Sequence, residues 1–313
     1  MNSVNDNKNE RENKGKAGWK DHSERSNPFT IKLICWIALN IGRNVARFFL
    51  YPITIYFFIT SPKVIRSSKN YFRRVNNSSV SAKSVFKHIH HFSATILDRV
   101  YFLTDQHERF EINIFGHEII EELMEKNQGA ILLGTHHGSF EVLRSLVNKI
   151  KKVPLKVLMY RDHNQMITRI FDELNPDVAA TVINLADANA LLEMQESVEN
   201  GNFVGMLGDR VTEGERSTEC VLLNDKVSFP SSPILLASIL KVPVILFYGI
   251  YHGGNRYDIH IELLAENIKI ERKNRENDVQ VWTQKVVSRL EHYIRLSPYN
   301  WFNFYDFWKD ENE

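Results

Sequence analysis

Two residues five positions apart, His136 and Glu141, could together perform general-base chemistry. A carboxylate that hydrogen-bonds one imidazole nitrogen fixes the tautomer and stabilises the imidazolium, and the other nitrogen can then take a proton from a hydroxyl. Within one continuous helix, side chains at i and i+5 point about 140° apart, because the helix has about 3.6 residues per turn. We therefore expect His136 in a turn before a helix and Glu141 in the first helical turn.

The residues around this pair predict a strand, a turn and a helix in that order. Residues 130–133 form a short apolar run that is typical of a buried strand, and Gly134 can make a tight turn after it. Gly138 would let the chain fold back, and Ser139 is a candidate N-cap for a helix that continues to about residue 147. The carboxyl end of a buried strand is where open α/β sheets bind ligands.

Two other interpretations of this segment remain open. His137 lies four residues before Glu141 and would face it on a helix, so these two residues form a rival pair. The segment could also be an ordinary helix start with two incidental histidines. The position at a strand–turn–helix junction favours a functional role.

Charged residues that follow other predicted strands could share the same site. Asp209 and Arg210 follow the buried run 203–207, with Gly208 between. The guanidinium of Arg210 is always charged, so it could hold a phosphate or the oxygen of a tetrahedral intermediate. An Asp–Arg surface pair that closes a turn is an equally good interpretation. Arg161 ends another predicted strand, where it could contact a substrate or be a solvated charge.

The pattern His136-x-x-x-x-Glu141, with an apolar helix after it, resembles the His-x-x-x-x-Asp/Glu signature of glycerolipid acyltransferases. The glutamate version is most similar to the late acyltransferases of bacterial lipid A biosynthesis, the lauroyl and myristoyl transferases. In that family the histidine is the general base, the acid is its partner, and a second acidic residue ends a strand near the histidine. The resemblance extends over roughly residues 28–308 and implies catalytic roles for these two residues and for Asp209 and Arg210.

A second segment, Phe229-Pro230, lies where these acyltransferases have a Phe-Pro sequence that shapes the acceptor side. The glycerol-phosphate branch continues with Glu-Gly, whereas this chain continues with Ser231 and Ser232. The difference argues against a glycerol-3-phosphate acceptor and fits the lipid A-like branch, although Pro230 could simply precede a helix. The aromatic tail 300–308 resembles glycolipid and aryl-polyene-type members, so we expect an acceptor other than lipid A itself.

The composition fits a globular protein, with 43% hydrophobic and 25% charged residues among 313. The net charge of +1 gives no argument for a nucleic-acid partner. Cys35 and Cys220 lack metal-site spacing, and the sequence contains no Gly-x-Gly-x-x-Gly, Walker-type loop or Cys-x-x-Cys. We expect no metal and no bound cofactor, because the resemblance implies a donor that is already activated, an acyl thioester of acyl carrier protein or coenzyme A.

The N-terminal part of the chain predicts a polar tail followed by a membrane anchor. Residues 1–27 are too polar to order themselves by burial. The apolar runs 31–42 and 48–60 are split by arginines, and neither reaches the roughly 20 residues that span a bilayer. We expect residues 28–75 to dip into or lie on the membrane, with one tilted span or two core helices as alternatives. The basic flank places a catalytic domain, residues 76–313, on the cytoplasmic side of the inner membrane.

After residue 110 the predicted strands and helices alternate, which favours an α/β fold with a mixed, mostly parallel sheet flanked by helices. Strands are predicted at residues 110–115, 130–133, 155–160, 181–184, 203–207, 219–223, 243–251 and 256–262. Helices are predicted at residues 80–103, 117–126, 139–147, 165–174, 188–199, 231–240 and 279–296. The first of these helices carries His88 and His91, for which a metal pair is less favoured than hydrogen-bonded or surface histidines.

These features predict a membrane-associated O-acyltransferase that moves a fatty acyl group from a thioester to a hydroxyl of a lipid or glycolipid. His136 would be the base and Glu141 its partner, and Arg210 or backbone N–H groups at Ser139 would hold the oxyanion. One alternative is a lipid or thioester hydrolase that uses the same pair with water, or Ser139 as nucleophile, although no Gly-x-Ser-x-Gly elbow surrounds that serine. The other is a non-catalytic, membrane-docked lipid-binding protein.

Overall fold

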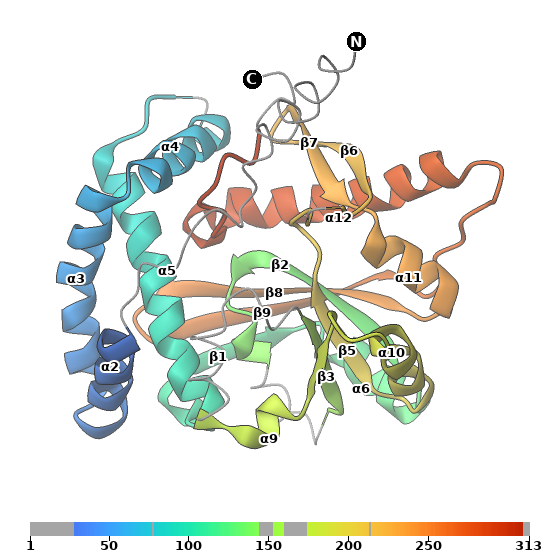
Figure 1. The fold of residues 1–313 in the computed structure, drawn as a ribbon, viewed down its shortest axis with the longest axis horizontal. Helices are drawn as coiled ribbons and strands as arrows, with labels where there is room; N and C mark the ends of the chain where they lie inside the picture. The colour runs from blue at the N-terminus through green and yellow to red at the C-terminus, as the bar shows by residue number, and fades with distance from the viewer. Residues whose placement is uncertain (1–27, 77, 144–152, 160–173, 213, 309–313) are drawn as a thin grey trace, which may run out of the picture.

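The structure is a computed structural model that describes residues 28–76, 78–143, 153–159, 174–212 and 214–308. A seven-stranded sheet in the order β1-β9-β8-β2-β5-β3-β4 lies at its centre, and a separate hairpin, β6–β7, stands beside it (Figure 1). The strands are Glu111–Phe115 (β1), Ala130–Gly138 (β2), Leu155–Met159 (β3), Val182–Asn184 (β4), Phe203–Leu207 (β5), Ser217–Leu222 (β6), Asp225–Pro230 (β7), Val244–Gly253 (β8) and Arg256–Ala265 (β9).

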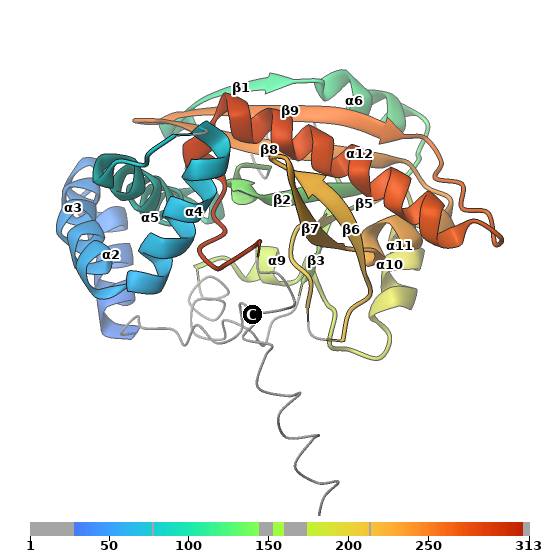
Figure 2. The ribbon, with the colours of Figure 1, turned by 90° about the horizontal axis from the view of Figure 1, so that it is seen from above.

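Helices cover both faces of this sheet, and one helical layer stands at its side (Figures 1 and 2). The α-helices are Pro28–Asn40 (α2), Arg43–Thr60 (α3), Pro62–Asn76 (α4), Ala82–Leu103 (α5), His117–Glu125 (α6), Pro176–Ala179 (α9), Ala190–Glu199 (α10), Ser232–Leu240 (α11) and Arg275–Leu296 (α12). Single 3-10 turns follow at His107–Arg109 (η2), Glu141–Leu143 (η3) and Pro298–Asn300 (η5).

Strand β2 lies in the middle of the sheet and pairs in parallel with both β5 and β8. Parallel pairs also join β1 to β9 and β3 to β4 and β5, whereas β8 and β9 are antiparallel. Within β2, Ile131 and Leu133 pack with the core under α11 and α12, and Ala130 and Leu132 pack with the core under α5 and α6. Burial on both faces explains the unbroken apolar run of this strand. The predicted mostly parallel α/β sheet is confirmed.

The N-terminal helices α2 to α4 pack against α5 at one side of the sheet (Figure 2). Arg43 of α3 forms a bidentate ion pair with the buried Asp98 of α5, at 2.8 and 2.7 Å, and the Tyr257 hydroxyl of β9 donates to the same carboxylate. These bonds fix the layer to the sheet.

Among the described helices, none alone has the length and apolar character of a membrane span. Helices α3 and α4 meet that test only as a pair, and the pair bends by 92°.

The largest difference from the predicted elements lies after the histidines. Strand β2 continues through Gly138, and the predicted helix at Ser139 is replaced by η3, while residues 144–152 lie outside the described residues. Gly138 has a φ of +83° and packs against Gly249 of β8, where an added Cβ would lie 1.9 Å from the carbonyl oxygen. The Ser139 N–H donates to that same oxygen at 2.8 Å, so pairing with β8 holds the chain extended where a helix was expected.

Three smaller differences concern the predicted strands and helices elsewhere. The run 219–223 belongs to the β6–β7 hairpin and not to the main sheet. The basic segment after α3 forms a full helix, α4, which the sequence did not predict. The predicted helix 165–174 lies almost wholly outside the described residues.

Candidate active site

The carboxyl ends of the neighbouring strands β2 and β5 bring His136 and Asp209 together. Gly134 pairs with Leu207. His136 follows Gly134 by two positions within β2, and Asp209 follows Leu207 by two positions just past the end of β5, so parallel pairing places them at the same level. The Nδ1 atom of His136 lies 2.6 Å from Oδ1 of Asp209, and the backbone N–H of His136 donates to Oδ2 at 3.0 Å. The strand register therefore fixes this pair at two points.

The Asp209 carboxylate is fully buried and held by further donors. The indole Nε1 of Trp301 and the amide Nδ2 of Asn303 both donate to its Oδ2 atom at 3.1 Å. Burial alone would raise the pKa of Asp209, but His136, Arg210 and the backbone N–H together hold that pKa below its ordinary value. The carboxylate is therefore ionised at neutral pH.

An ionised carboxylate only accepts hydrogen bonds, so the proton of the neutral His136 ring lies on Nδ1. The Nε2 atom then carries the free electron pair, and the side chain is 26% exposed. The pKa of His136 is lowered from 6.5, first by burial and then by the charges of Arg210 and Arg99, against the opposing effect of Asp209. The ring is thus neutral at pH 7, which is the form that can act as a base.

The guanidinium of Arg210 is anchored by the C-terminal tail. Its Nε donates to Oδ1 of Asn303 at 2.8 Å, and a terminal nitrogen donates to the carbonyl oxygen of Phe302 at 3.0 Å. Burial lowers the pKa of Arg210, and the charge of Asp209 opposes that shift. Because an arginine remains charged at any physiological pH, a fixed positive charge lies beside the dyad of His136 and Asp209.

Glu141 contacts a different partner from the one predicted. Its carboxylate forms an ion pair with Nε of Arg99 on α5 at 2.8 Å, and the Ser139 hydroxyl lies 3.5 Å from its second oxygen. The extended chain through Gly138 removes the helical turn that was expected to bring Glu141 back to His136, and Asp209 occupies Nδ1 instead. The backbone N–H of Ser139, predicted as an oxyanion donor, is bound to the Gly249 carbonyl oxygen.

His137 and His88 make structural hydrogen bonds. His137 is buried, its Nε2 lies 3.2 Å from the Ser297 carbonyl oxygen, and burial lowers its pKa to about 4, so the rival pair with Glu141 is not formed. His88 bridges the Ser68 hydroxyl at 2.6 Å and the Trp301 carbonyl oxygen at 2.8 Å, which confirms a hydrogen-bonded histidine. The described residues contain no cluster of three or more His, Cys, Asp or Glu suited to a metal ion.

The remaining predicted site residues lie elsewhere or outside the described part. Arg161 is outside the described residues. Phe229 is fully buried and its ring packs edge-on against Phe307, with centroids 5.6 Å apart. Pro230 ends β7 and pairs with Ser217 in the hairpin. These two residues therefore build the core and the hairpin instead of projecting toward His136.

Trp301 and Asn303 are site residues that the sequence interpretation missed. The sequence indicated only a resemblance of the aromatic tail to glycolipid and aryl-polyene-type members, and nothing in the composition of the tail pointed to contacts with Asp209.

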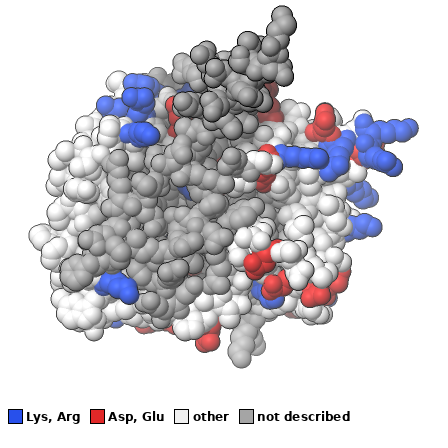
Figure 3. All heavy atoms as spheres, viewed as in Figure 1, with Lys and Arg blue, Asp and Glu red and all other residues white. Residues whose placement is uncertain are grey.

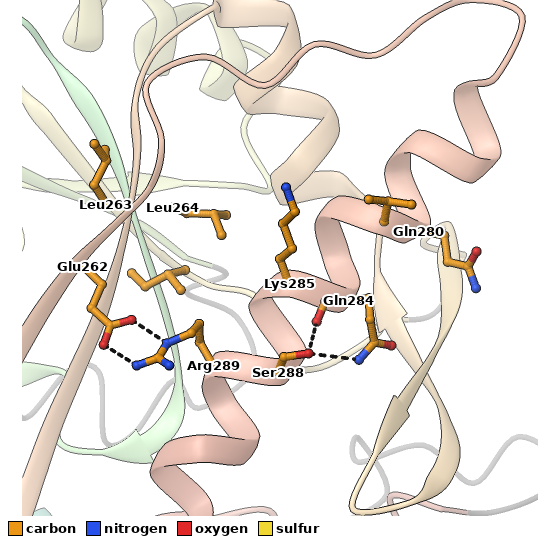
Figure 4. A pocket seen from close by; sticks show the side chains of 10 residues that line it. Glu262, Leu263, Leu264, Gln280, Gln284, Lys285, Ser288 and Arg289 are labelled. Carbon is orange, nitrogen blue, oxygen red and sulfur yellow. Dashed lines mark hydrogen bonds and ion pairs between the residues drawn. The ribbon is translucent and has the colours of Figure 1, made fainter.

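A separate groove of about 600 Å³ between β9 and α12 is lined by Leu263, Leu264 and Val281 and by the Glu262–Arg289 ion pair (Figure 4). None of the residues that line this groove belongs to the dyad and its partners.

The family assignment follows from a comparison with protein-family models. The model described as bacterial lipid A biosynthesis acyltransferase matches residues 83–310, well over half of the chain. The matched region includes His136, Glu141, Asp209 and Asn303. Comparison with curated proteins gives no match. Because this model covers most of the chain, the chain belongs to the bacterial lipid A biosynthesis acyltransferase family and is an acyltransferase.

Proposed function

We propose that this protein is a membrane-associated O-acyltransferase that moves a fatty acyl group from a thioester to a hydroxyl of a lipid or glycolipid. One observation supports the chemistry most directly: Asp209 holds Nδ1 of His136, which leaves Nε2 as the basic atom of a side chain that is 26% exposed. General-base assistance of this kind contributes about 10²–10⁴-fold to a rate.

The reaction needs one proton relay and no redox step. The acceptor hydroxyl gives its proton to Nε2 of His136 as its oxygen attacks the thioester carbonyl, and Asp209 stabilises the imidazolium that forms. The tetrahedral intermediate then expels the thiolate, which takes the proton back from Nε2. The products are an ester and a free thiol. The positive charge of Arg210, close enough to lower the pKa of His136, favours the negative charge of the intermediate.

In this mechanism Asp209, and not Glu141, is the direct partner of His136. We assign Glu141 a supporting role, because its carboxylate holds Arg99, whose charge also reaches the His136 ring. The motif acid thus orients a second cation at the edge of the site. This assignment predicts that loss of Glu141 is milder than loss of Asp209.

The donor and acceptor are proposed on chemical grounds. A thioester of acyl carrier protein or coenzyme A is already activated, and a thiolate with a pKa near 8.5 is a better leaving group than an alkoxide. No metal or bound cofactor enters the proposed steps. The Ser231-Ser232 sequence argues against glycerol 3-phosphate as acceptor, and the aromatic tail favours a lipid or glycolipid hydroxyl other than lipid A itself.

Membrane association is supported by the outer side of the helical layer. Large apolar side chains project from α2, α3 and their junction with 40–72% of their surface exposed: Leu33, Trp36, Ile41, Val45, Phe48, Phe49, Tyr51, Ile55, Tyr56 and Ile59. The side of the molecule formed by these helices carries few charges in Figure 3, whereas basic atoms gather at its α4 end. Exposed Lys63, Arg66 and Arg73 of α4 would meet anionic headgroups. We place this surface in the cytoplasmic leaflet of the inner membrane.

Lipid mass spectrometry of cells that produce the protein, compared with cells that produce the His136→Ala variant, tests this function. A lipid heavier by one acyl unit only with the unchanged protein would demonstrate acyl transfer and identify the acceptor. The Ser139→Ala variant serves as the matched control, because a hydrolase with a serine nucleophile would lose activity and the proposed transferase would keep it. Identical lipids in all three strains, together with no thioester consumption by the purified protein, would refute the proposal.

A further inference from the structure

The C-terminal tail crosses the ends of the two strands that carry the dyad. The backbone N–H of Phe302 donates to the His136 carbonyl oxygen at 2.8 Å, and Trp301 forms an isolated antiparallel bridge with His137. The tail therefore continues the pairing of β2 on the side where the site lies. Its side chains enter the site from a segment 90 residues or more beyond β5 in the sequence.

Asn303 is the residue of this tail that joins the two charged groups beside His136. Its Nδ2 donates to Asp209 at 3.1 Å and its Oδ1 accepts from Nε of Arg210 at 2.8 Å. The side chain is 3% exposed, so water cannot replace these bonds. The two contacts also fix the orientation of the amide, because a carboxylate only accepts and a guanidinium only donates.

We propose that Asn303 is a positioning residue that holds the Asp209 carboxylate and the Arg210 guanidinium in one fixed arrangement around His136. The inference deepens the proposed function, in which His136 is the base. A neutral amide suits the task, because it bonds an anion and a cation at once and adds no charge of its own. An aspartate at this position would lose the donor toward Asp209, and an alanine would lose both bonds.

The arrangement has a measurable consequence for the basicity of His136. The charged groups that face the ring are Asp209 and Arg210 from the end of β5 and Arg99 from α5. Without Asn303, the Asp209 carboxylate has one donor fewer and attracts the imidazolium more strongly. Arg210 keeps its bond to the Phe302 carbonyl oxygen but loses the Nε bond to Asn303, so the guanidinium can shift away from the ring, which weakens its repulsion of the imidazolium. Both effects raise the pKa of His136, so they cannot cancel.

Asn300 provides a matched control in the same tail. Its side chain is 2% exposed and forms two hydrogen bonds, accepting from the Tyr251 backbone N–H at 2.9 Å and donating to the Tyr251 carbonyl oxygen at 3.0 Å. An alanine at either position removes two buried hydrogen bonds and a similar volume. Replacing Asn303 disturbs the groups around His136, whereas replacing Asn300 disturbs the contact between the tail and β8.

The test is the pKa of the His136 ring, measured by NMR titration of the full-length protein without substrate and assigned by the signal missing from His136→Gln. We expect Asn303→Ala to raise this pKa by about half a unit or more, given the strength of hydrogen bonds to charged groups. Asn300→Ala should leave it unchanged, although both variants unfold more easily. Should Asn303→Ala not fold, Asn303→Ser, which keeps one hydroxyl there, should shift the pKa in the same direction by less.

An unchanged pKa in the Asn303 variants, or an equal shift in the two alanine variants, would overturn the proposal. Because this measurement involves no acyl transfer, it remains informative even if the proposed reaction is wrong. Conversely, a raised pKa together with an inactive unchanged protein would uphold the role of Asn303 and refute the proposed function alone.

Discussion

Replacing Asp209 by asparagine should stop His136 from acting as a base, although a side chain of the same size stays at position 209. In the native site Oδ2 of Asp209 accepts from the His136 backbone N–H, Trp301 and Asn303, whereas Oδ1 accepts from Nδ1 of His136. An amide has a single oxygen. That oxygen will occupy the position where the larger number of donors converge, so the NH₂ group will face Nδ1.

Nδ1 must then accept a hydrogen bond, and the proton of the neutral ring moves to Nε2. In that tautomer the atom that faces the acceptor hydroxyl is no longer a base, and no carboxylate stabilises the imidazolium. The comparable change in a serine-protease triad costs about 10⁴-fold in kcat, so we expect a loss of about 10³–10⁴-fold in kcat for Asp209→Asn. KM should change little, because the carboxylate is fully buried and does not contact substrate.

The assay is thioester-dependent ester formation by the purified protein, combined with ¹⁵N NMR of the histidine ring to identify the tautomer. Asp98→Asn is the matched control. Asp98 is an equally buried carboxylate, but its partners are Arg43 and Tyr257, and neither of these bonds involves His136 or Asp209. It should lower the free energy of unfolding and preserve most of the kcat of the folded fraction. An Asp209→Asn enzyme that keeps a tenth of its kcat, or keeps the Nδ1–H tautomer, would refute the reasoning.

Three further predictions concern the motif acid, acid stability and the membrane surface. Glu141→Gln should lower kcat about tenfold at most, because it breaks the Arg99 ion pair but keeps the hydrogen bond between Asp209 and His136. A loss as large as that of Asp209→Asn would show that Glu141 is the direct partner of His136. His88 and His137 are buried with pKa values of about 4, so between pH 6.5 and 4 the unfolded chain binds protons that the folded protein does not, and stability falls as pH falls. Urea unfolding should show a loss of about 2 kcal/mol per ring by pH 5, and a flat profile would contradict these burial effects. Phe48 and Ile59 are 70% and 72% exposed on α3, so Phe48→Glu and Ile59→Glu should each weaken flotation with anionic vesicles about tenfold or more. Leu191→Glu on α10 should not weaken it. Equal flotation of all variants would show that the surface of α2 and α3 does not bind the membrane.

The sheet was predictable because its strands carry their own signal. β2, β5 and β8 are short apolar runs bounded by glycine or polar residues, and burial on both faces produces that pattern directly. The convergence of Asp209 and Arg210 on His136 could also be anticipated, because parallel neighbouring strands end at one edge. The order of the strands had to come from the structure.

The partner of His136 could not be obtained from spacing. The five-residue interval to Glu141 suggested a turn that folds back, but the contact of Gly138 with Gly249 of β8 keeps the chain extended. That contact joins residues more than 100 positions apart, so no local rule contains it. The same holds for Trp301 and Asn303, whose role depends on where the tail returns to the sheet.

The pH dependence of kcat/KM for acyl transfer tests the central claim most directly, because it reports the ionisation of the free enzyme. The structure predicts that kcat/KM is constant near neutral pH and falls in acid with an apparent pKa below 6.5, since burial and Arg210 lower the pKa of His136. His136→Gln should abolish both the activity and this acid limb. A substantial rate in His136→Gln with the same acid limb would show that another group is the base and would contradict the account.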